Sequence, residues 1–325
     1  MIYPWQNKLW EQLNTKRERM PHALLIHGAQ GIGKLALAER FAQRLLCESA
    51  DARSAPCGEC EGCRWFDAGS HPDFRRVEPE ALARQYGTAE DLDEPAAAPT
   101  RSAKPSNEIK VDQVRALDGF LNLKSHRGGR RVALIHPAEA MNPNAANALL
   151  KGLEEPPGST LFLLVSHRPA RLLATIRSRC VAVPVEVPDA AAALAWLEGQ
   201  GLRDPAPWLA FAGGSPLLAL RSAKEAGAAL ARLRQALQAS DLDALGAVND
   251  RGQLEELAEV LQKHALDKAF AAYGGRAKYG SATGSRQGVA WLRYARLMGR
   301  NRALARHPLN PRLFAGEMLR ELPEA

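Results

Sequence analysis

A glycine-rich loop at residues 28–35 has the residue types that bind phosphate. It follows an apolar run at residues 23–26 and opens an amphipathic segment, which is the strand, loop and helix order of a P-loop. Glycines let backbone N–H groups converge on a phosphate, and a helix N-terminus adds partial positive charge. The loop glycines are Gly28, Gly31 and Gly33. Lys34 would reach the outer phosphates, so the loop predicts a site for ATP or ADP.

Two parts of the machinery for ATP hydrolysis depart from what the reaction requires. The residue after Lys34 should carry a hydroxyl that holds Mg²⁺, but it is Leu35. The neighbouring buried strand should end in an acidic pair, and those places hold His136 and Pro137. Glu139 is expected to sit in the following helix and point elsewhere. These departures predict no hydrolysis and leave nucleotide binding open.

Four of the five cysteines form a second group with a recognisable spacing. Cys47, Cys57, Cys60 and Cys63 follow the pattern C-x9-C-x2-C-x2-C. Two Cys-x-x-Cys steps can place thiolates on one tetrahedral ion, and four thiolates leave no open position for water or substrate. The spacing favours structural Zn²⁺ over incidental thiols or a redox pair.

The first part of the chain alternates strands and helices. Buried or half-buried strands are expected at residues 23–27, 74–77, 131–135, 160–165 and 181–187, with helices between them. This order predicts an α/β domain over residues 1–187 with a largely parallel sheet. Residues 79–106 are rich in Ala, Pro, Glu and Asp and are expected to form a flexible, exposed insert.

After residue 188 the pattern changes to helices only. We expect a small helical domain at 188–212 and a larger helical domain at 213–325, with Gly213, Gly214, Ser215 and Pro216 at the boundary. Leu254, Leu257, Leu261 and Ala265 predict a buried stripe on one helix of the larger domain.

The composition of the chain limits which classes of protein it can belong to. The chain has 325 residues, a net charge of +7 and ordinary apolar and charged fractions, so two or three globular domains are expected. The charge permits an acidic partner such as nucleic acid. No apolar run approaches the roughly 18 residues of a membrane span. The N-terminus lacks a signal-peptide pattern, and the cysteine usage fits a reducing cytoplasm.

Several further motifs, together with the glycine loop and the cysteine insert, resemble the clamp-loader branch of the AAA+ ATPases. These are the segments His71-Pro72-Asp73, Ile109-Lys110-Val111-Asp112, Asn147-Ala148-Leu149-Leu150-Lys151-Gly152-Leu153-Glu154-Glu155-Pro156-Pro157 and Ser178-Arg179-Cys180. The resemblance covers nearly the whole chain, and the ordered set is far more specific than a glycine loop alone.

The resemblance implies an α/β P-loop (RecA-like AAA+) domain with a small four-cysteine zinc module, then an all-α lid and an all-α collar. It implies that Arg179, between Ser178 and Cys180, reaches a neighbouring subunit's ATP. A collar sensor arginine of the motor subunits is replaced by Leu217, a third departure from a hydrolysing site. The implied partners are motor (gamma/tau-type) and delta-type subunits in a hetero-oligomeric ring, a sliding clamp and primed DNA, within a DNA polymerase assembly.

The residues also leave two other hypotheses for the function open. The chain could be an independent ATPase that uses Lys34 with an unusual Mg²⁺ site, or a zinc-module protein that binds DNA without loader partners. Magnesium-dependent hydrolysis by the purified chain would favour the first. Strongly salt-dependent DNA binding without assembly would favour the second.

Overall fold

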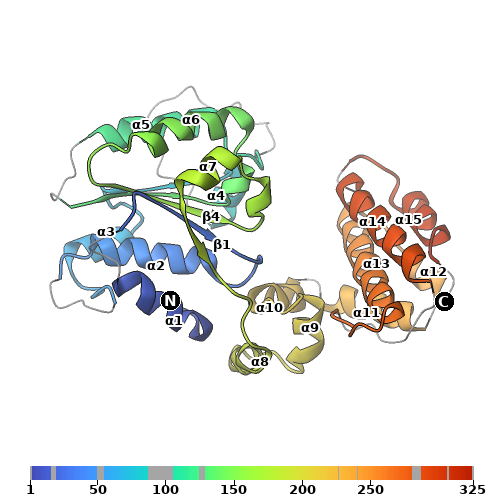
Figure 1. Cartoon of the computed structure of the whole chain (residues 1–325). Coiled ribbons are helices and arrows are strands. Elements are labelled where there is room, and N and C mark those ends of the chain that lie inside the picture. Colours follow the sequence, from blue (N-terminus) through green and yellow to red (C-terminus); the bar gives the residue numbers. More distant parts are fainter. Residues whose placement is uncertain are drawn as a thin grey trace. The chain divides into compact units, whose positions relative to one another are not determined.

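The computed structural model forms two compact units, Met1–Val187 and Pro188–Ala325 (Figure 1). It describes residues 2–15, 20–49, 55–86, 105–123, 129–225, 227–239, 241–279, 287–305 and 307–323. In this part of the chain, no helix combines the length and the apolar character needed to cross a membrane.

The first unit is built on a five-stranded parallel sheet with the order β2-β3-β4-β1-β5. The strands are β1 (Ala23–His27), β2 (Phe74–Val77), β3 (Arg131–Ile135), β4 (Thr160–Ser166) and β5 (Val181–Pro184). The three central strands are almost entirely buried, as a parallel sheet covered on both faces requires. The expected α/β domain with a parallel sheet is confirmed.

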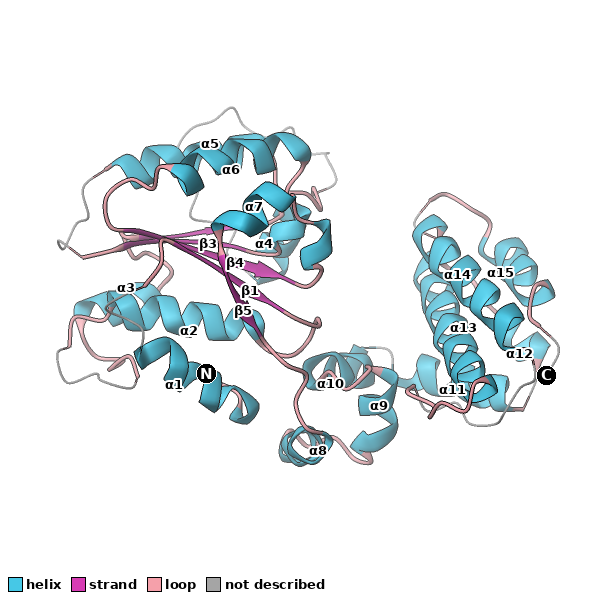
Figure 2. Cartoon of the chain, viewed as in Figure 1, coloured by secondary structure: helices cyan, strands magenta, loops and turns pink. Residues whose placement is uncertain are grey.

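Helices cover both faces of this sheet (Figure 2). One face packs against α1 (Asn7–Thr15) and α2 (Lys34–Leu46), and the other against α5 (Val111–Asn122), α6 (Pro143–Glu154) and α7 (Ala174–Arg179). Successive strand side chains point to opposite faces, so Leu24 and Ile26 join the first core while Ala23 and Leu25 join the second. A short helix, α3 (Glu61–Asp67), follows the cysteine segment, and Pro4–Gln6 forms a single 3₁₀ turn, η1.

The prediction of a flexible insert at 79–106 is wrong for its beginning, because residues Glu80–Tyr86 form helix α4. The Glu80 carboxylate accepts a hydrogen bond from the Ser106 backbone N–H at 3.2 Å and pairs with Lys110 Nζ at 2.6 Å. These contacts join the helix to the last residue of the insert and to Lys110 beyond it, so local composition could not reveal them. Residues 87–104 lie outside the described residues.

The second unit contains only helices among its described residues. They are α8 (Ala190–Gly199), α9 (Pro205–Phe211), α10 (Pro216–Glu225), α11 (Gly227–Gln238), α12 (Leu242–Gly246), α13 (Arg251–Ala272), α14 (Gly288–Leu304) and α15 (Pro311–Arg320). The expected stripe on α13 is buried as predicted, and it packs against Trp291 and Met298 of α14.

A smaller core joins α8, α9 and α10 through Leu197, Leu209 and Ala219. Gly213 and Gly214 adopt φ values of 64° and 87°, and they turn the chain from α9 into α10. These glycines therefore form a tight turn inside the small helical core, which extends beyond residue 212, where we expected the boundary.

Candidate functional site

The glycine loop lies between β1 and α2, at the carboxyl end of the central strands. Gly28, Gly31 and Gly33 have φ values of 152°, 79° and 86°, which L side chains rarely adopt. A Cβ on Gly28 would lie 2.2 Å from the backbone oxygen of Val185. The predicted glycines are therefore required by the loop's own shape.

Lys34 is buried at the first turn of α2, and its ammonium group bonds to the loop itself. Nζ donates to the Gly28 carbonyl at 2.9 Å and to the Ala29 carbonyl. Burial lowers the pKa of Lys34 to about 8, and the Glu139 carboxylate opposes this shift. The lysine is thus in the predicted place, with its donors directed to backbone oxygens.

The N-terminal segment covers the same loop through contacts between residues too distant in the chain to be predicted from local pattern. Trp5 Nε1 and Gln6 Nε2 each donate to the Ile32 carbonyl at 3.0 Å. A Cβ on Gly33 would lie 2.3 Å from the Tyr3 ring. Leu35 packs into the apolar core beside α2, so its side chain offers nothing to a metal ion.

Two imidazoles lie at the ends of β3 and β4, and His136 occupies one of the two places where a hydrolysing site would carry its acidic pair. His136 Nε2 lies 3.3 Å from His167 Nε2. Burial, and next the neighbouring His167, lowers the pKa of His136 to about 3. Burial, and next Lys34, lowers the pKa of His167 to about 4. Both rings are therefore neutral near pH 7 and are poor partners for Mg²⁺.

Glu139 differs from its expected position. It lies in a short 3₁₀ turn (Ala138–Ala140), and its Oε1 accepts the backbone N–H of His167 at 2.9 Å. The carboxylate is thus fixed to the end of β4 and influences Lys34 and His136 electrostatically. His167 could have been found from the sequence, because it directly follows a buried strand parallel to β3.

The four predicted cysteines come together. Their Sγ atoms all lie within 4.8 Å of one another, with separations of 3.6 Å for Cys47–Cys57 and 3.9 Å for both Cys57–Cys63 and Cys47–Cys60. A tetrahedral ion with Zn–S bonds of about 2.3 Å requires sulfurs about 3.8 Å apart. The geometry and the donor set therefore fit a structural zinc site.

Backbone N–H groups point at these sulfurs. The Cys60 N–H donates to Cys57 Sγ at 3.3 Å, and the Cys63 N–H donates to Cys60 Sγ at 3.4 Å. Hydrogen bonds from Cys60 and Glu59 lower the pKa of the Cys57 thiol to about 6, whereas burial raises the pKa of the Cys63 thiol. A bound Zn²⁺ would deprotonate both thiols, because its charge outweighs burial.

Arg179 ends α7 with its guanidinium group held at two points. Nη2 lies 2.7 Å from Glu154 Oε1 at the end of α6, and Nη1 donates to the Thr175 carbonyl at 3.0 Å. The side chain remains about a third exposed, at 35%. The Ser178 hydroxyl also donates a hydrogen bond to the Thr175 carbonyl, at 3.0 Å. Burial raises the pKa of the neighbouring Cys180 thiol to about 11. The polar partners of Arg179 thus belong to α6 and α7, and none belongs to the glycine loop.

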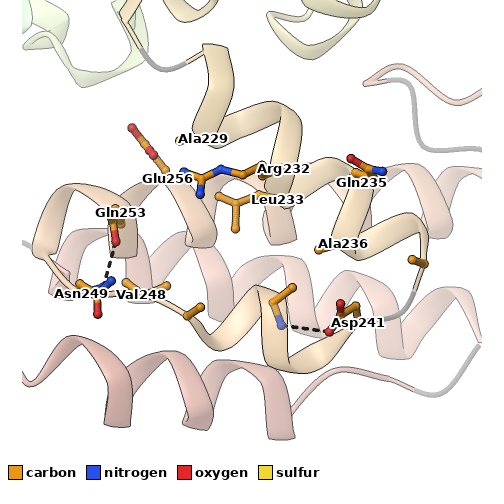
Figure 3. Close-up of a pocket in the computed structure, with 13 residues that line it drawn as sticks. Ala229, Arg232, Leu233, Gln235, Ala236, Asp241, Val248, Asn249, Gln253 and Glu256 are labelled. Carbon is orange, nitrogen blue, oxygen red and sulfur yellow. Dashed lines mark hydrogen bonds between the residues drawn. The ribbon is translucent and has the colours of Figure 1, made fainter.

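A cavity of about 480 Å³ lies in the second unit, between α11, α12 and α13 (Figure 3). Leu233, Ala236 and Val248 line its apolar side. Its polar rim is ordered by short-range hydrogen bonds, including the Asn249 N–H to Gln253 Oε1 at 2.9 Å. The lining contains none of the predicted site residues.

Comparison with known proteins identifies the family. The family described as "DNA polymerase III, delta subunit" matches residues 5–189. The protein named DNA polymerase III subunit delta' of Pseudomonas aeruginosa is 48% identical over 224 residues, which cover 68% of this chain and 61% of that protein. The Escherichia coli protein of the same name is 35% identical over 70% of this chain and 60% of its own length.

The chain belongs to the DNA polymerase III delta' family. The match spans about three fifths of the length of both of these relatives. A DNA polymerase III gamma subunit-related protein from Thermotoga maritima has a similar fold, with a TM-score of 0.51, 18% identity and coverage of 96% of this chain and 97% of that one. Both relatives carry the name of a DNA polymerase III subunit, which agrees with the resemblance that the motifs indicate.

Proposed function

We propose that this delta' family member is a clamp-loader subunit that does not hydrolyse ATP itself. It supplies Arg179 to the ATP of a neighbouring motor (gamma/tau-type) subunit, in a ring that also holds a delta-type subunit. The ring opens the sliding clamp and loads it on primed DNA. The chain thus serves the polymerase holoenzyme without hydrolysing ATP itself. The small helical lid follows the first domain, and the helical collar after it assembles the ring.

One observation carries this proposal: Arg179 presents a partly exposed, fixed guanidinium group, while the end of β3 beside the chain's own glycine loop lacks the acidic pair of a hydrolysing site. A guanidinium group stays charged, and its fork matches phosphate oxygens. An arginine supplied in trans is worth roughly 10³–10⁵ in rate at the site it serves. The His136–His167 pair, which is neutral, and the apolar Leu35 supply neither Mg²⁺ ligands nor a base.

We further propose that Cys47, Cys57, Cys60 and Cys63 hold one structural Zn²⁺. The ion would fix the described residues between α2 and α3 (47–49 and 55–60), which contribute no side chain to the described apolar cores. Nucleotide, if it binds at Gly28, Gly31, Gly33 and Lys34, would do so without hydrolysis.

The test is reconstitution of the loader with its motor, delta-type and clamp subunits. Arg179→Ala should slow DNA-stimulated hydrolysis at the neighbouring site by at least about tenfold. Arg177→Ala, an exposed arginine on the same helix, is the matched control and should leave turnover unchanged. Normal turnover in the assembled Arg179→Ala loader would remove the role of Arg179. Magnesium-dependent hydrolysis by the purified chain, abolished by Lys34→Ala, would identify an independent ATPase instead.

A further inference from the structure

The positive charge of the chain is concentrated in one stretch of the second unit. Residues 268–316 contain ten Lys and Arg residues and no Asp or Glu, whereas the net charge of the whole chain is +7. The remainder of the chain is therefore slightly acidic. Such segregation is the electrostatic footprint of a polyanion site when the charges share one face.

The exposed face of α14 collects three of these charges. Arg293, Arg296 and Arg300 are all exposed, and they follow Val289 at intervals of four, seven and eleven residues. At about 100° per residue these positions fall within an arc of about 60°, and the arginines span about 10 Å along the helix. The opposite face of α14 is buried through Trp291, Ala295 and Met298 and related residues. The stripe is therefore fixed outward by the packing of the helix.

These three arginines make no ion pair within the described part of the chain. By contrast, Arg302, on the side of α14 that faces α13, pairs with Glu259 at 2.7 Å. Charges less than a Debye length of about 10 Å apart reinforce one another, so three unpaired arginines in a row create a strongly positive surface. Guanidinium groups also bind phosphate oxygens in a bidentate manner.

Two exposed aromatic side chains lie at the end of α13, and one of them contacts the first residue of α14. Phe270 and Tyr273 at the end of α13 are 46% and 67% exposed. A Cβ on Gly288, the first residue of α14, would lie 2.6 Å from the Tyr273 ring, so the ring lies against the start of the helix. Arg276 and Lys278 follow directly and are exposed. Aromatic side chains beside a basic track are what single-stranded nucleic acid uses, because its bases can stack on them.

We propose that the α14 arginine stripe and the Phe270–Tyr273 pair bind single-stranded DNA. The arginines hold successive phosphates, and the aromatic rings accept unstacked bases. The inference deepens the proposed function, since it makes DNA a ligand of this chain itself. The DNA-binding proposal can be refuted while the proposed role of Arg179 stands, because it concerns binding by the chain alone and needs no ATP turnover.

The test uses the full chain and a fluorescein-labelled thymidine oligonucleotide of about 20 nucleotides, with binding followed by anisotropy. The triple variant Arg293→Gln, Arg296→Gln, Arg300→Gln should weaken binding about tenfold or more at about 50 mM salt. Loss of three phosphate contacts should also reduce the slope of log K against log salt by about 2. Tyr273→Ala should weaken binding about fivefold or more through lost stacking, while leaving that slope unchanged.

The matched control removes three exposed arginines elsewhere in the unit: Arg203→Gln, Arg221→Gln and Arg251→Gln. It lowers the net charge equally and should keep the parent affinity and slope. Circular dichroism confirms that each variant is folded. Equal weakening by the control, or no binding by the parent at about 100 µM protein, would overturn the proposal. So would a stripe variant that binds DNA normally and fails to assemble with loader subunits, because the stripe would then be a protein interface.

Discussion

Arg179 owes its geometry to a single acidic partner on another helix. Arg179 Nη2 forms an ion pair with Glu154 Oε1 at 2.7 Å, and Nη1 donates a hydrogen bond to the Thr175 carbonyl. Half-exposed ion pairs add little to the free energy of unfolding. Their other effect is to restrict rotamers, and a long side chain loses up to about 2 kcal/mol of conformational freedom when it is fixed. We therefore interpret Glu154 as a positioning residue for the Arg179 guanidinium group.

Glu154→Gln should lower DNA-stimulated turnover of the assembled loader by about fivefold, because Arg179 must then be ordered at each encounter. The adjacent Glu155→Gln is the matched control, since Glu155 is exposed and has no ion pair with Arg179. The double variant Glu154→Gln, Arg179→Ala should be no slower than Arg179→Ala alone. Turnover that rises in Glu154→Gln would show that the ion pair restrains the arginine instead.

The His136–His167 pair makes the stability of the first unit depend on pH. The pKa values of both rings lie near 3 to 4 in the folded chain and near 6.5 when unfolded. The unfolded state therefore binds more protons below pH 6.5. The stabilisation is fully present above that pH and is lost as the pH falls toward the folded-state values.

Between pH 7 and pH 5, His136 alone should cost about 2 kcal/mol of unfolding free energy. His136→Gln should remove that part of the acid sensitivity, as measured by urea denaturation at the two pH values. The exposed His307→Gln should keep the parent's pH dependence. An unchanged pH dependence in His136→Gln would mean that folding does not lower the pKa of His136, so that the imidazole is charged at pH 5 in the folded chain as well.

At the scale of elements, the β1–loop–α2 segment keeps the shape of a phosphate loop for steric reasons of its own. Gly28 closes against the Val185 carbonyl at the end of β5, and Gly33 lies under the Tyr3 ring. Gly28→Ala should therefore lower the free energy of unfolding by about 2 kcal/mol or more, since both φ and the space for a Cβ are unfavourable. Urea denaturation at constant m-value measures this loss.

Gly119→Ala supplies the control for that measurement. Gly119 lies inside α5, and a Cβ there would meet nothing within 4 Å. Its replacement should stabilise the chain by about 0.5–1 kcal/mol through helix propensity. A Gly28→Ala variant as stable as the parent would show that the loop can relax away from β5.

The strands and the cysteine cluster could be read from the sequence because each depends on local pattern. Apolar runs mark β1, β3 and β4, and the spacing of the cysteines already limits how far apart their sulfurs can lie. Two contacts could not be predicted from the sequence, because each joins residues distant in the chain. They are the packing of the Tyr3 ring on Gly33 and the ion pair between Glu80 and Lys110. Helix α4 was missed for the same reason.

At the scale of the whole molecule, the apolar cores divide along the two units. Each described core cluster draws its residues either from the first unit or from the second. The cysteine cluster belongs to the first unit and is joined to the sheet through His71, whose Nδ1 accepts the Asp73 N–H at 3.0 Å and whose ring meets Trp65 edge-on at 6.0 Å. Zinc binding should therefore stabilise the first unit alone.

The purified chain should contain one equivalent of Zn²⁺, and its removal by a chelator should lower the melting temperature of the first unit only. A ligand that binds the folded state alone adds stability that is lost when it is withdrawn. Hydrogen exchange should show faster exchange in α2 and α3 after chelation, with α13 and α14 unchanged. Cys63→Ser should reproduce the effect, whereas Cys180→Ser, outside the cluster, should not. Zinc well below one equivalent with four freely titratable thiols would refute the site. A shift in α13 and α14 would instead show that the two units unfold together, since the loss of one metal site would then be felt across both cores.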